Sequence, residues 1–305
     1  MPVTINDSGP ATHSRRTFLM LRQAGIKISR VCLLVYLGLL ALLYFFQTRL
    51  IFPGADTQGK SDSHVKPRSG TELISLETAS KDKVVALFGA ALSATGAPLP
   101  DSGTRPTLLY FYGNGTNLLD VNSEVFDRFR RLGVNVLVPD YAGYGMSGGA
   151  AGEQACYQTA DACYKHLLTR EDVDPKRIVV AGQSLGGAVA IDLASRHDVA
   201  GLVAFSTFTR MSEMASRQYP FVPASLLLRH RFDSIDKIAR VRCPILFGHG
   251  NADRFIPSDM CTTLAAAAKA PVTTFLVEKA GHNDFYSVGD RQVFEHLKSF
   301  LSRLP

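Results

Sequence analysis

From Thr71 onward, short apolar runs alternate with longer runs in which apolar residues recur at helical spacing, and this alternation strongly constrains the fold. Strands separated by helices pair in parallel, so the pattern predicts an α/β fold with a mostly parallel central sheet and helices on both faces. The first two strands have no helix between them, and we expect an antiparallel hairpin at the sheet edge. The predicted strands lie at 71–77, 84–89, 107–113, 134–140, 178–182, 201–206, 244–250 and 272–278, and the predicted helices at 118–132, 153–169, 184–197, 258–269 and 291–302.

Ser184 lies between two glycines, in the pattern Gly182-x-Ser184-x-Gly186, where the fifth predicted strand meets a predicted helix. A serine hydroxyl becomes a strong nucleophile only when a base takes its proton, so it must stand where a histidine can reach it. A tight strand-to-helix turn provides that exposure, and flanking glycines let the backbone approach closely. The same pattern also fits a serine that merely caps a helix. The motif alone leaves both interpretations open.

An acid and a histidine follow Ser184 in chain order, each just beyond a predicted strand. Asp253 lies in the loop after the seventh strand, and His282 lies in the loop after the eighth. Ligands of parallel sheets bind at the carboxyl ends of the strands, so these loops should meet Ser184. We predict a catalytic triad of Ser184, Asp253 and His282. Each could also be an ordinary loop residue, and Asp140 and Asp284 are the acids to examine if Asp253 is not the partner.

An oxyanion hole needs two N–H donors beside the nucleophile. The residue after the nucleophile, Leu185, should supply one of them from the N-terminus of the predicted helix. The second should come from the loop after the third strand, where Asn114 lies between Gly113 and Gly115 in the stretch YGNGTN. The alternative for that loop is a simple Gly-Asn-Gly turn.

These motifs resemble those of α/β-hydrolases, and in particular of membrane-anchored serine hydrolases with an α/β-hydrolase domain, a group that includes protein depalmitoylases. The resemblance covers nearly all of the chain from the apolar N-terminal segment onward, and is carried by GQSLGG, NADRFIP, GHNDF, YGNGTN and PDYAGYGMSGG. It implies an α/β-hydrolase fold with a small lid, and hydrolysis of carboxylic esters or thioesters through an acyl-enzyme. It implies no metal and no organic cofactor. Most such relatives carry His-Gly-Asn at the oxyanion loop, whereas Tyr112 replaces that histidine here.

Two other functions stay open on the sequence. Serine peptidases of the prolyl-oligopeptidase type share the same motif and triad order, but they usually carry a large extra domain or a long lid, for which this chain has no room. A catalytically silent binding protein on the same fold is the other alternative, although silent members typically lack a triad residue. The stretch GYGMSG matches a dinucleotide fingerprint, but no helix begins within it, so we predict a structural loop.

The N-terminal part of the chain consists of a basic tail and an apolar segment. Residues 1–30 carry five Lys or Arg and one Asp, and the next sixteen residues, 31–46, carry no charge. At about 1.5 Å per residue this segment spans about 24 Å, a little less than a hydrocarbon core of about 30 Å. We predict a transmembrane anchor, with a cleaved signal peptide and a buried core helix as alternatives. The excess of Lys and Arg before the segment favours a catalytic domain outside the cytosol.

Composition restricts the partners and the domain plan. Residues 47–70 are rich in Gly, Pro and Ser, which predicts a linker ahead of a catalytic domain at 71–305. Most of the net charge of +6 lies in the tail, so the domain has no field suited to nucleic acid. Cys156 and Cys163 stand about 10 Å apart along a predicted helix, too far to pair, and no Cys/His cluster indicates a metal site. We expect the partners to be the membrane and an acyl ester or thioester, either a lipid or a lipidated protein.

The stretch between the sixth and seventh strands is too short for a large lid. Its apolar residues either line an acyl pocket or pack on the sheet: Met211, Met214, Tyr219, Phe221 and 226–228. The basic residues from Arg229 to Arg242 either meet anionic headgroups or form a solvated face.

Overall fold

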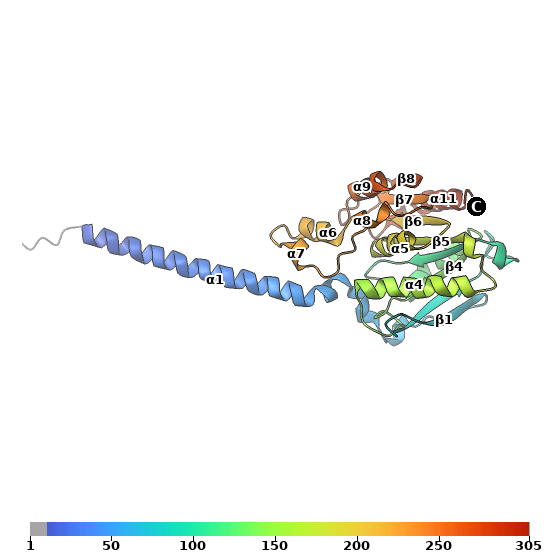
Figure 1. The fold of residues 1–305 in the computed structure, drawn as a ribbon, viewed down its shortest axis with the longest axis horizontal. Coiled ribbons are helices and arrows are strands. Elements are labelled where there is room, and N and C mark those ends of the chain that lie inside the picture. Colours follow the sequence, from blue (N-terminus) through green and yellow to red (C-terminus); the bar gives the residue numbers. More distant parts are fainter. Residues whose placement is uncertain (1–10, 305) are drawn as a thin grey trace, which may run out of the picture. The chain divides into compact units, whose positions relative to one another are not determined.

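The computed structural model describes residues 11–304, with side chains from Phe18 onward. The chain divides into two compact units between Gln47 and Thr48. The helix α1, Ala11–Ile51, forms the described part of the first unit and continues into the second. The second unit contains all the described strands, and we call it the sheet unit (Figure 1).

An eight-stranded sheet runs through the sheet unit in the order β1-β2-β4-β3-β5-β6-β7-β8. β2 pairs antiparallel with both β1 and β4, and all the other pairs are parallel. The predicted strands, their mostly parallel pairing and the edge hairpin are therefore confirmed. The strands are β1 (Thr71–Glu77), β2 (Lys83–Gly89), β3 (Thr107–Phe111), β4 (Asn135–Pro139), β5 (Ile178–Gln183), β6 (Gly201–Phe205), β7 (Ile245–Gly250) and β8 (Val272–Val277).

All five predicted helices are present, and one of them is interrupted. The helix expected at 118–132 is split at Val125, whose side chain is buried and whose φ of −125° lies outside the helical range. Several short helices were not predicted, because four to eight residues hold too few turns to establish a period. The helices are α2 (Leu118–Glu124), α3 (Phe126–Arg130), α4 (Glu153–Thr169), α5 (Leu185–Arg196), α6 (Met211–Gln218), α7 (Ala224–Leu227), α8 (Ile235–Ile238), α9 (Asp259–Ala267), α10 (Phe285–Val288) and α11 (Asp290–Leu301).

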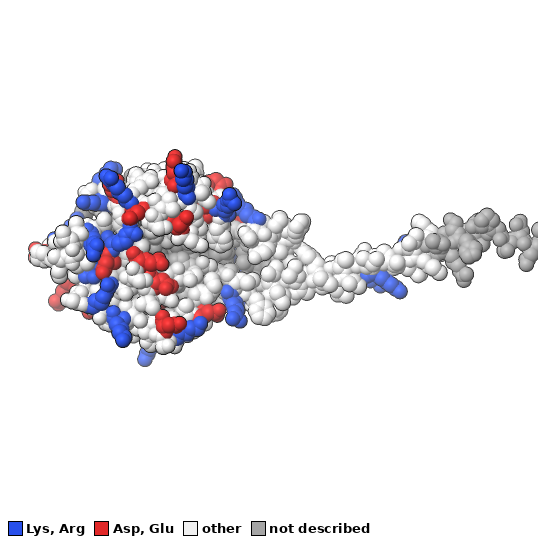
Figure 2. Space-filling view, turned by 180° about the vertical axis from the view of Figure 1, so that it is seen from behind, with Lys and Arg blue, Asp and Glu red and all other residues white. Residues whose placement is uncertain are grey.

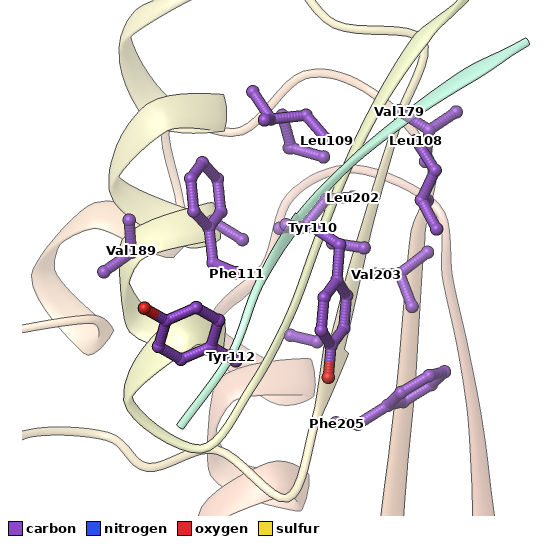
Figure 3. Close-up of a cluster of buried hydrophobic side chains, with 14 of the residues drawn as sticks. Leu108, Leu109, Tyr110, Phe111, Tyr112, Val179, Val189, Leu202, Val203 and Phe205 are labelled. Carbon is purple, nitrogen blue, oxygen red and sulfur yellow. The ribbon is translucent and has the colours of Figure 1, made fainter. Parts of the chain in front are cut away.

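The central strands are buried on both faces, which explains their continuous apolar sequences. All five residues of β3 are buried, and their side chains alternate between the two faces of the sheet. Figure 3 shows Leu109 and Phe111 on the side of Val189, which belongs to α5, and Tyr110 on the opposite side. Tyr110 packs on Phe129 of α3, with 4.9 Å between ring centroids. The sheet therefore has α5 on one face and α3 on the other.

The helix α1 contains the candidate membrane span. Phe18–Ile51 is long and apolar enough to cross a membrane by its length and composition, and none of its most apolar window is buried. Figure 2 shows basic side chains near the described beginning of the helix, followed by a stretch without charged side chains. The segment predicted at 31–46 thus lies within a longer helix. Residues 1–10 of the predicted basic tail lie outside the described residues, and so do the side chains of Arg15 and Arg16.

The segment 47–70, for which composition predicts a linker, packs on the sheet unit. The helix α1 continues to Ile51, and two short 3-10 turns follow it at Pro53–Thr57 and Ser61–Ser63. Phe52 is 1% exposed and Val65 is 3% exposed. The Gly, Pro and Ser residues indicated turns, which the structure has, but these two apolar side chains belong to the hydrophobic core. The packed domain therefore begins well before Thr71.

Candidate active site

Ser184 occupies the turn between β5 and α5 in a backbone conformation that few residues adopt. Its φ is +56° and its ψ is −123°, a combination that is sterically unfavourable for a residue with a Cβ atom. The turn is held because the Ser184 N–H donates to the Phe205 carbonyl, and the Thr207 hydroxyl donates to the Ser184 carbonyl, both at 2.9 Å. Strain of this kind is expected where a nucleophile is raised above the end of a strand.

The two glycines of the motif are required by close backbone contacts. A Cβ atom on Gly182 would lie 2.1 Å from the Gly186 carbonyl oxygen, and one on Gly186 would lie 2.0 Å from the Phe111 carbonyl oxygen. Only glycine allows β5, α5 and the end of β3 to approach so closely. The helix-cap alternative for Ser184 is not what the structure shows, because its side chain makes no capping hydrogen bond.

The structure brings the three predicted triad residues together. Ser184 Oγ lies 3.0 Å from His282 Nε2, and His282 Nδ1 lies 2.8 Å from Asp253 Oδ2. Each residue stands just past the carboxyl end of a strand, at β5, β7 and β8. Ser184 and the Asp253 carboxylate are buried, whereas the His282 side chain is 15% exposed and reaches a cavity. These contacts are the ones that proton transfer from serine to histidine requires.

Asp253 accepts several hydrogen bonds besides that of His282. The backbone N–H groups of Phe255 and Ile256 donate to Oδ1 at 2.9 and 2.8 Å, and His249 Nε2 lies 3.4 Å from Oδ2. Burial alone would raise the pKa of Asp253, but the hydrogen bonds of His249, His282 and the backbone together hold this pKa well below its usual value. The carboxylate is therefore ionised at neutral pH, beside the ring that would become positively charged.

His249 is a residue of this site that the sequence analysis missed. It is fully buried at the end of β7, and its Nε2 donates to the Ile256 carbonyl at 2.8 Å, which fixes the tautomer. It thereby supports the loop that carries Asp253. The available signal was its position four residues before Asp253 in the stretch HGNAD.

The two alternative acids have other partners. Asp284 Oδ1 accepts a hydrogen bond from the Gly281 N–H at 2.6 Å, which stabilises the loop around His282. Asp140 directly follows β4 and is completely buried. Within the described residues, neither carboxylate is hydrogen-bonded to His282, so Asp253 is the acid that the geometry favours.

Asp140 holds both ends of the loop at 113–117, which we call the oxyanion loop. The Tyr112 hydroxyl and the Leu118 N–H each donate to Asp140 Oδ1 at 2.8 Å, and the Met146 N–H donates to Oδ2 at 2.8 Å. Burial raises the pKa of Asp140 against the effect of these three hydrogen bonds. Tyr112, which replaces the histidine of many relatives, therefore supports the loop through its hydroxyl group.

The predicted oxyanion donors lie beside the nucleophile. Leu185 is the first residue of α5, where backbone N–H groups have no partner within the helix. Asn114 belongs to the oxyanion loop, and its neighbour Gly113 lies so close that a Cβ atom there would be 3.5 Å from Ser184 Cβ. Asn114, Leu185 and Ser184 all line one cavity. The assignment of these N–H groups to an oxyanion hole stays a prediction.

Two cavities of different character meet at Ser184. A polar cavity of about 770 Å³ includes the oxyanion loop, Glu124, Arg128 and His282. An apolar cavity of about 250 Å³ also reaches Ser184, and both cavities include Asn114 in their linings. Of the apolar residues singled out in the sequence, this second cavity is lined by Met211, Met214, Tyr219 and Leu228, whereas Phe221 and Leu226 are exposed by 86% and 84%.

The glycine-rich stretch GYGMSG forms a closed loop. The Gly143 N–H donates to the Gly148 carbonyl at 2.8 Å, and the next helix, α4, begins only at Glu153. A dinucleotide fingerprint would open directly into a helix whose N-terminus faces the phosphates. The structural-loop interpretation is the one that this geometry favours.

The comparisons with known sequences establish the family. Residues 113–236 match the model of the alpha/beta hydrolase family. An uncharacterized protein of Mycobacterium tuberculosis (strain ATCC 25618 / H37Rv) is 32% identical over 281 residues, which cover 92% of this chain and 96% of that protein. The alpha/beta hydrolase domain-containing protein 17B of Homo sapiens is 32% identical over 197 residues, which cover 65% of this chain and 66% of that protein. The chain belongs to the α/β-hydrolase family.

Solved structures show the same fold. An esterase of Pyrococcus furiosus superimposes with a TM-score of 0.64 at 19% identity, covering 77% of this chain and 91% of that one. The alpha/beta hydrolase GrgF from a Penicillium species gives a TM-score of 0.63 at 15% identity, covering 76% of this chain and 98% of that one. At these sequence identities the similarity concerns the fold alone, and the chemistry depends on the residues of the site.

Proposed function

We propose that this chain is a membrane-anchored serine hydrolase that cleaves carboxylic ester or thioester bonds through an acyl-enzyme. The observation that carries the proposal is the pair of contacts from Ser184 Oγ to His282 Nε2 and from His282 Nδ1 to Asp253 Oδ2, at 3.0 and 2.8 Å. The esterase from Pyrococcus furiosus, which has the same fold, is in keeping with this chemistry.

In the acylation step, Ser184 Oγ attacks the substrate carbonyl carbon while His282 Nε2 takes the hydroxyl proton. Asp253 keeps the proton on His282 Nδ1 and stabilises the imidazolium ring that forms. The negative charge on the carbonyl oxygen is met by the N–H groups of Leu185 and Asn114. When the tetrahedral intermediate collapses, His282 donates the proton to the departing alcohol or thiol, and the acyl group stays on Ser184.

In the deacylation step, a water molecule takes the place of the leaving group. His282 removes a proton from this water, and the hydroxide attacks the acyl carbon of the Ser184 ester. The second tetrahedral intermediate releases the carboxylic acid, and the proton held by His282 returns to Ser184 Oγ. The chain's own residues supply every proton transfer, so the reaction consumes only the ester and water.

The two cavities suggest how a substrate is divided across the site. The apolar cavity, with Met211, Met214 and Leu228 in its lining, suits an acyl chain. The polar cavity, which includes Glu124 and Arg128, suits a polar leaving group. A lipid or a lipidated protein has this combination of parts. The candidate span in α1 supports retention at a membrane where such substrates occur.

The test uses the full chain in detergent and a fluorophosphonate probe, which modifies activated serines. The wild-type protein should be labelled, and Ser184→Ala should lose both the labelling and at least about 10⁴-fold in turnover of 4-nitrophenyl esters. Ser195→Ala is the matched control, because Ser195 lies on the helix that follows Ser184, and within the described part of the chain its hydroxyl is hydrogen-bonded only to the Asp192 carbonyl. Labelling or turnover that persists in Ser184→Ala would refute the assignment of the nucleophile.

A panel of acyl esters, thioesters and amides then identifies the class of bond. We expect esters or thioesters to be cleaved much faster than amides of the same acyl group. Faster amide cleavage would support a peptidase instead. A folded wild-type protein that is neither labelled nor active would support a silent binding protein.

A further inference from the structure

The end of α1 is joined to the oxyanion loop by hydrogen bonds through a single residue, Asn114. The Asn114 side-chain Nδ2 donates to the carbonyl of Ile51, the last residue of α1, at 2.7 Å. In the opposite direction, the Gly54 N–H donates to the Asn114 carbonyl at 3.0 Å. We call residues 48–54, all of which belong to the sheet unit, the helix-end segment. Asn114 is thus held to this segment by its side chain and by its backbone.

A third hydrogen bond is made to the Asn114 carbonyl group. The Tyr144 hydroxyl donates to the Asn114 carbonyl at 2.9 Å, so this oxygen accepts from two donors on different segments. The Asn114 N–H, by contrast, donates to no acceptor among residues 11–304. Asn114 also lines both cavities beside Ser184. The side chain and the carbonyl of Asn114 are thus held by hydrogen bonds, whereas its N–H is left without an acceptor among residues 11–304.

Gly54 can make its contact only because it has no side chain. A Cβ atom at this position would lie 2.3 Å from Tyr144 Cε1 and 2.8 Å from the Asn114 carbonyl oxygen. No unstrained arrangement would allow those separations, so any larger residue must push Tyr144 or the oxyanion loop away. The sequence thus places glycine where the helix-end segment meets the loop.

The helix-end segment has its own contacts that keep it in place. Phe52 is 1% exposed and packs edge-on against His230, with 5.0 Å between ring centroids. The Thr48 hydroxyl lies 2.9 Å from His230 Nε2. The last carbonyl groups of a helix have no partner within it, so the Ile51 carbonyl is free to accept from Asn114. The segment is a fixed support rather than a flexible connection.

We infer that the helix-end segment positions the oxyanion donor. Ile51 and Gly54 are positioning residues, which act on the reaction by fixing where the Asn114 N–H points. Asn114 has a double role, because its N–H contacts the oxyanion and its side chain holds the loop. This inference rests on the proposed function. It also means that the working catalytic domain begins at about Thr48 and includes the end of the helix that carries the candidate span.

The test is Asn114→Ala in the full chain in detergent, because alanine keeps the backbone N–H and removes only the side-chain hydrogen bond to Ile51. A misplacement of about 1 Å in a catalytic group lowers rates about 100-fold, so we expect kcat for a 4-nitrophenyl ester to fall about 10- to 100-fold. KM should change little, because the support acts on the transition state. The affinity for an alkyl boronic acid, which forms a tetrahedral adduct on the serine, should fall by the same factor as kcat/KM.

Gly54→Ala should act in the same direction through its clash with Tyr144 and Asn114. Gln58→Ala is the matched control. The Gln58 side-chain amide also ties this part of the chain to the loop at 143–149, through hydrogen bonds of 3.0 Å to the Ser147 and Gly149 carbonyls, and among residues 11–304 it makes no hydrogen bond to Asn114. We expect Gln58→Ala to keep the wild-type kcat and the wild-type boronic acid affinity.

Hydrogen exchange gives a readout that does not depend on activity. The Gly54 amide, which donates to the Asn114 carbonyl, and the Leu118 amide, which donates to Asp140 at the end of the oxyanion loop, should exchange faster in Asn114→Ala than in the wild type, and should be unchanged in Gln58→Ala. Unchanged exchange and an unchanged kcat in Asn114→Ala would overturn the inference, as would equal losses in Gln58→Ala. An inactive and unlabelled wild-type protein would instead overturn the proposed function, while the exchange experiment would still decide whether the helix-end segment holds the loop.

Discussion

At the scale of single residues, the surroundings of Asp253 favour its ionised form. Its two carboxylate oxygens accept from two backbone N–H groups and face two histidine rings. An amide in its place would present an N–H₂ group where His282 or the backbone needs an acceptor. An ionised carboxylate accepts at both oxygens and so keeps the proton on His282 Nδ1, and the lowered pKa of Asp253 maintains that ionised form.

We therefore predict that Asp253→Asn lowers kcat by about 10⁴-fold, as loss of the orienting acid does in serine hydrolases with this triad. The measurement is steady-state turnover of a 4-nitrophenyl ester. Asp284→Asn is the control, because Asp284 caps the neighbouring Gly281 N–H without contacting His282. A loss of less than tenfold in Asp253→Asn would mean that another group orients His282.

The candidate site shows which side-chain relations can be predicted from a sequence. Ser184, Asp253 and His282 were predictable because each follows a strand of a parallel sheet, where topology alone brings loops together. The hydrogen bond from Asn114 to Ile51 was not, because it joins residues 63 positions apart and depends on how a helix end packs. His249 was missed because the only signal for it, its position four residues before Asp253, does not show that its ring turns back to support the loop.

At the scale of elements, the strands were predictable and the connections between them were not. Almost every residue of the five strands β3 to β7 is buried, so each of their sequences is a short apolar run that indicates a buried strand. The composition of 47–70 predicted a linker because Gly and Pro indicate turns, but composition does not indicate that the Phe52 side chain is buried. Short helices such as α6 and α7 depend on tertiary packing more than on periodicity.

The helix α6 forms one wall of the apolar cavity, through Met211 and Met214. We predict that Met214→Phe shortens the acyl chain that the enzyme accepts, because the larger ring fills part of a cavity of about 250 Å³. Long-chain 4-nitrophenyl esters should lose about tenfold in kcat/KM, which is about the effect of one methylene group that the pocket cannot accommodate. Esters of butyryl or shorter acyl groups should be little affected. Leu226→Phe is the control, because Leu226 is 84% exposed and does not line the cavity. An unchanged chain-length profile would place the acyl group elsewhere.

The end of α1 is held by a histidine whose charge state depends on pH. His230 accepts from the Glu153 N–H through Nδ1 at 3.3 Å and faces the Thr48 hydroxyl through Nε2, so the ring is neutral in this arrangement. Burial lowers the pKa of His230, and Arg229 adds to this effect while Glu153 opposes it. A histidine with a lowered pKa in the folded state contributes its full stability above the unfolded pKa of about 6.5, and loses it as the pH falls below that value.

We therefore predict that the unfolding temperature in detergent falls between pH 7.5 and pH 5.5, and that His230→Gln makes this fall smaller. Burial also lowers the pKa of His166, so the flattening in His230→Gln should be partial. Differential scanning fluorimetry over this range is the measurement. An identical pH dependence in the wild type and in His230→Gln would show that His230 does not titrate during unfolding.

At the scale of the whole molecule, the apolar part of α1 is the segment that would hold the proposed enzyme at a membrane. The charge-free segment 31–46 lies within a candidate span at Phe18–Ile51, and Leu34 and Leu39 are both exposed in the structure. An arginine near the centre of a spanning helix costs about 2.5–3.5 kcal/mol on insertion scales, so two of them should prevent stable insertion. We predict that the double variant Leu34→Arg, Leu39→Arg leaves the membrane fraction on alkaline carbonate extraction, whereas the wild type stays.

The distribution of basic residues predicts the orientation of the same anchor. Five Lys or Arg precede the charge-free segment within twenty residues, and three follow it: Arg49, Lys60 and Lys66. Because the more basic flank stays in the cytosol, the sheet unit should lie on the opposite side of the membrane. Protease added to intact cells or right-side-out vesicles should then digest the sheet unit, and should spare it in inside-out vesicles. The reverse protection pattern would place the active site in the cytosol, where the substrates would be lipids or lipidated proteins of the inner leaflet.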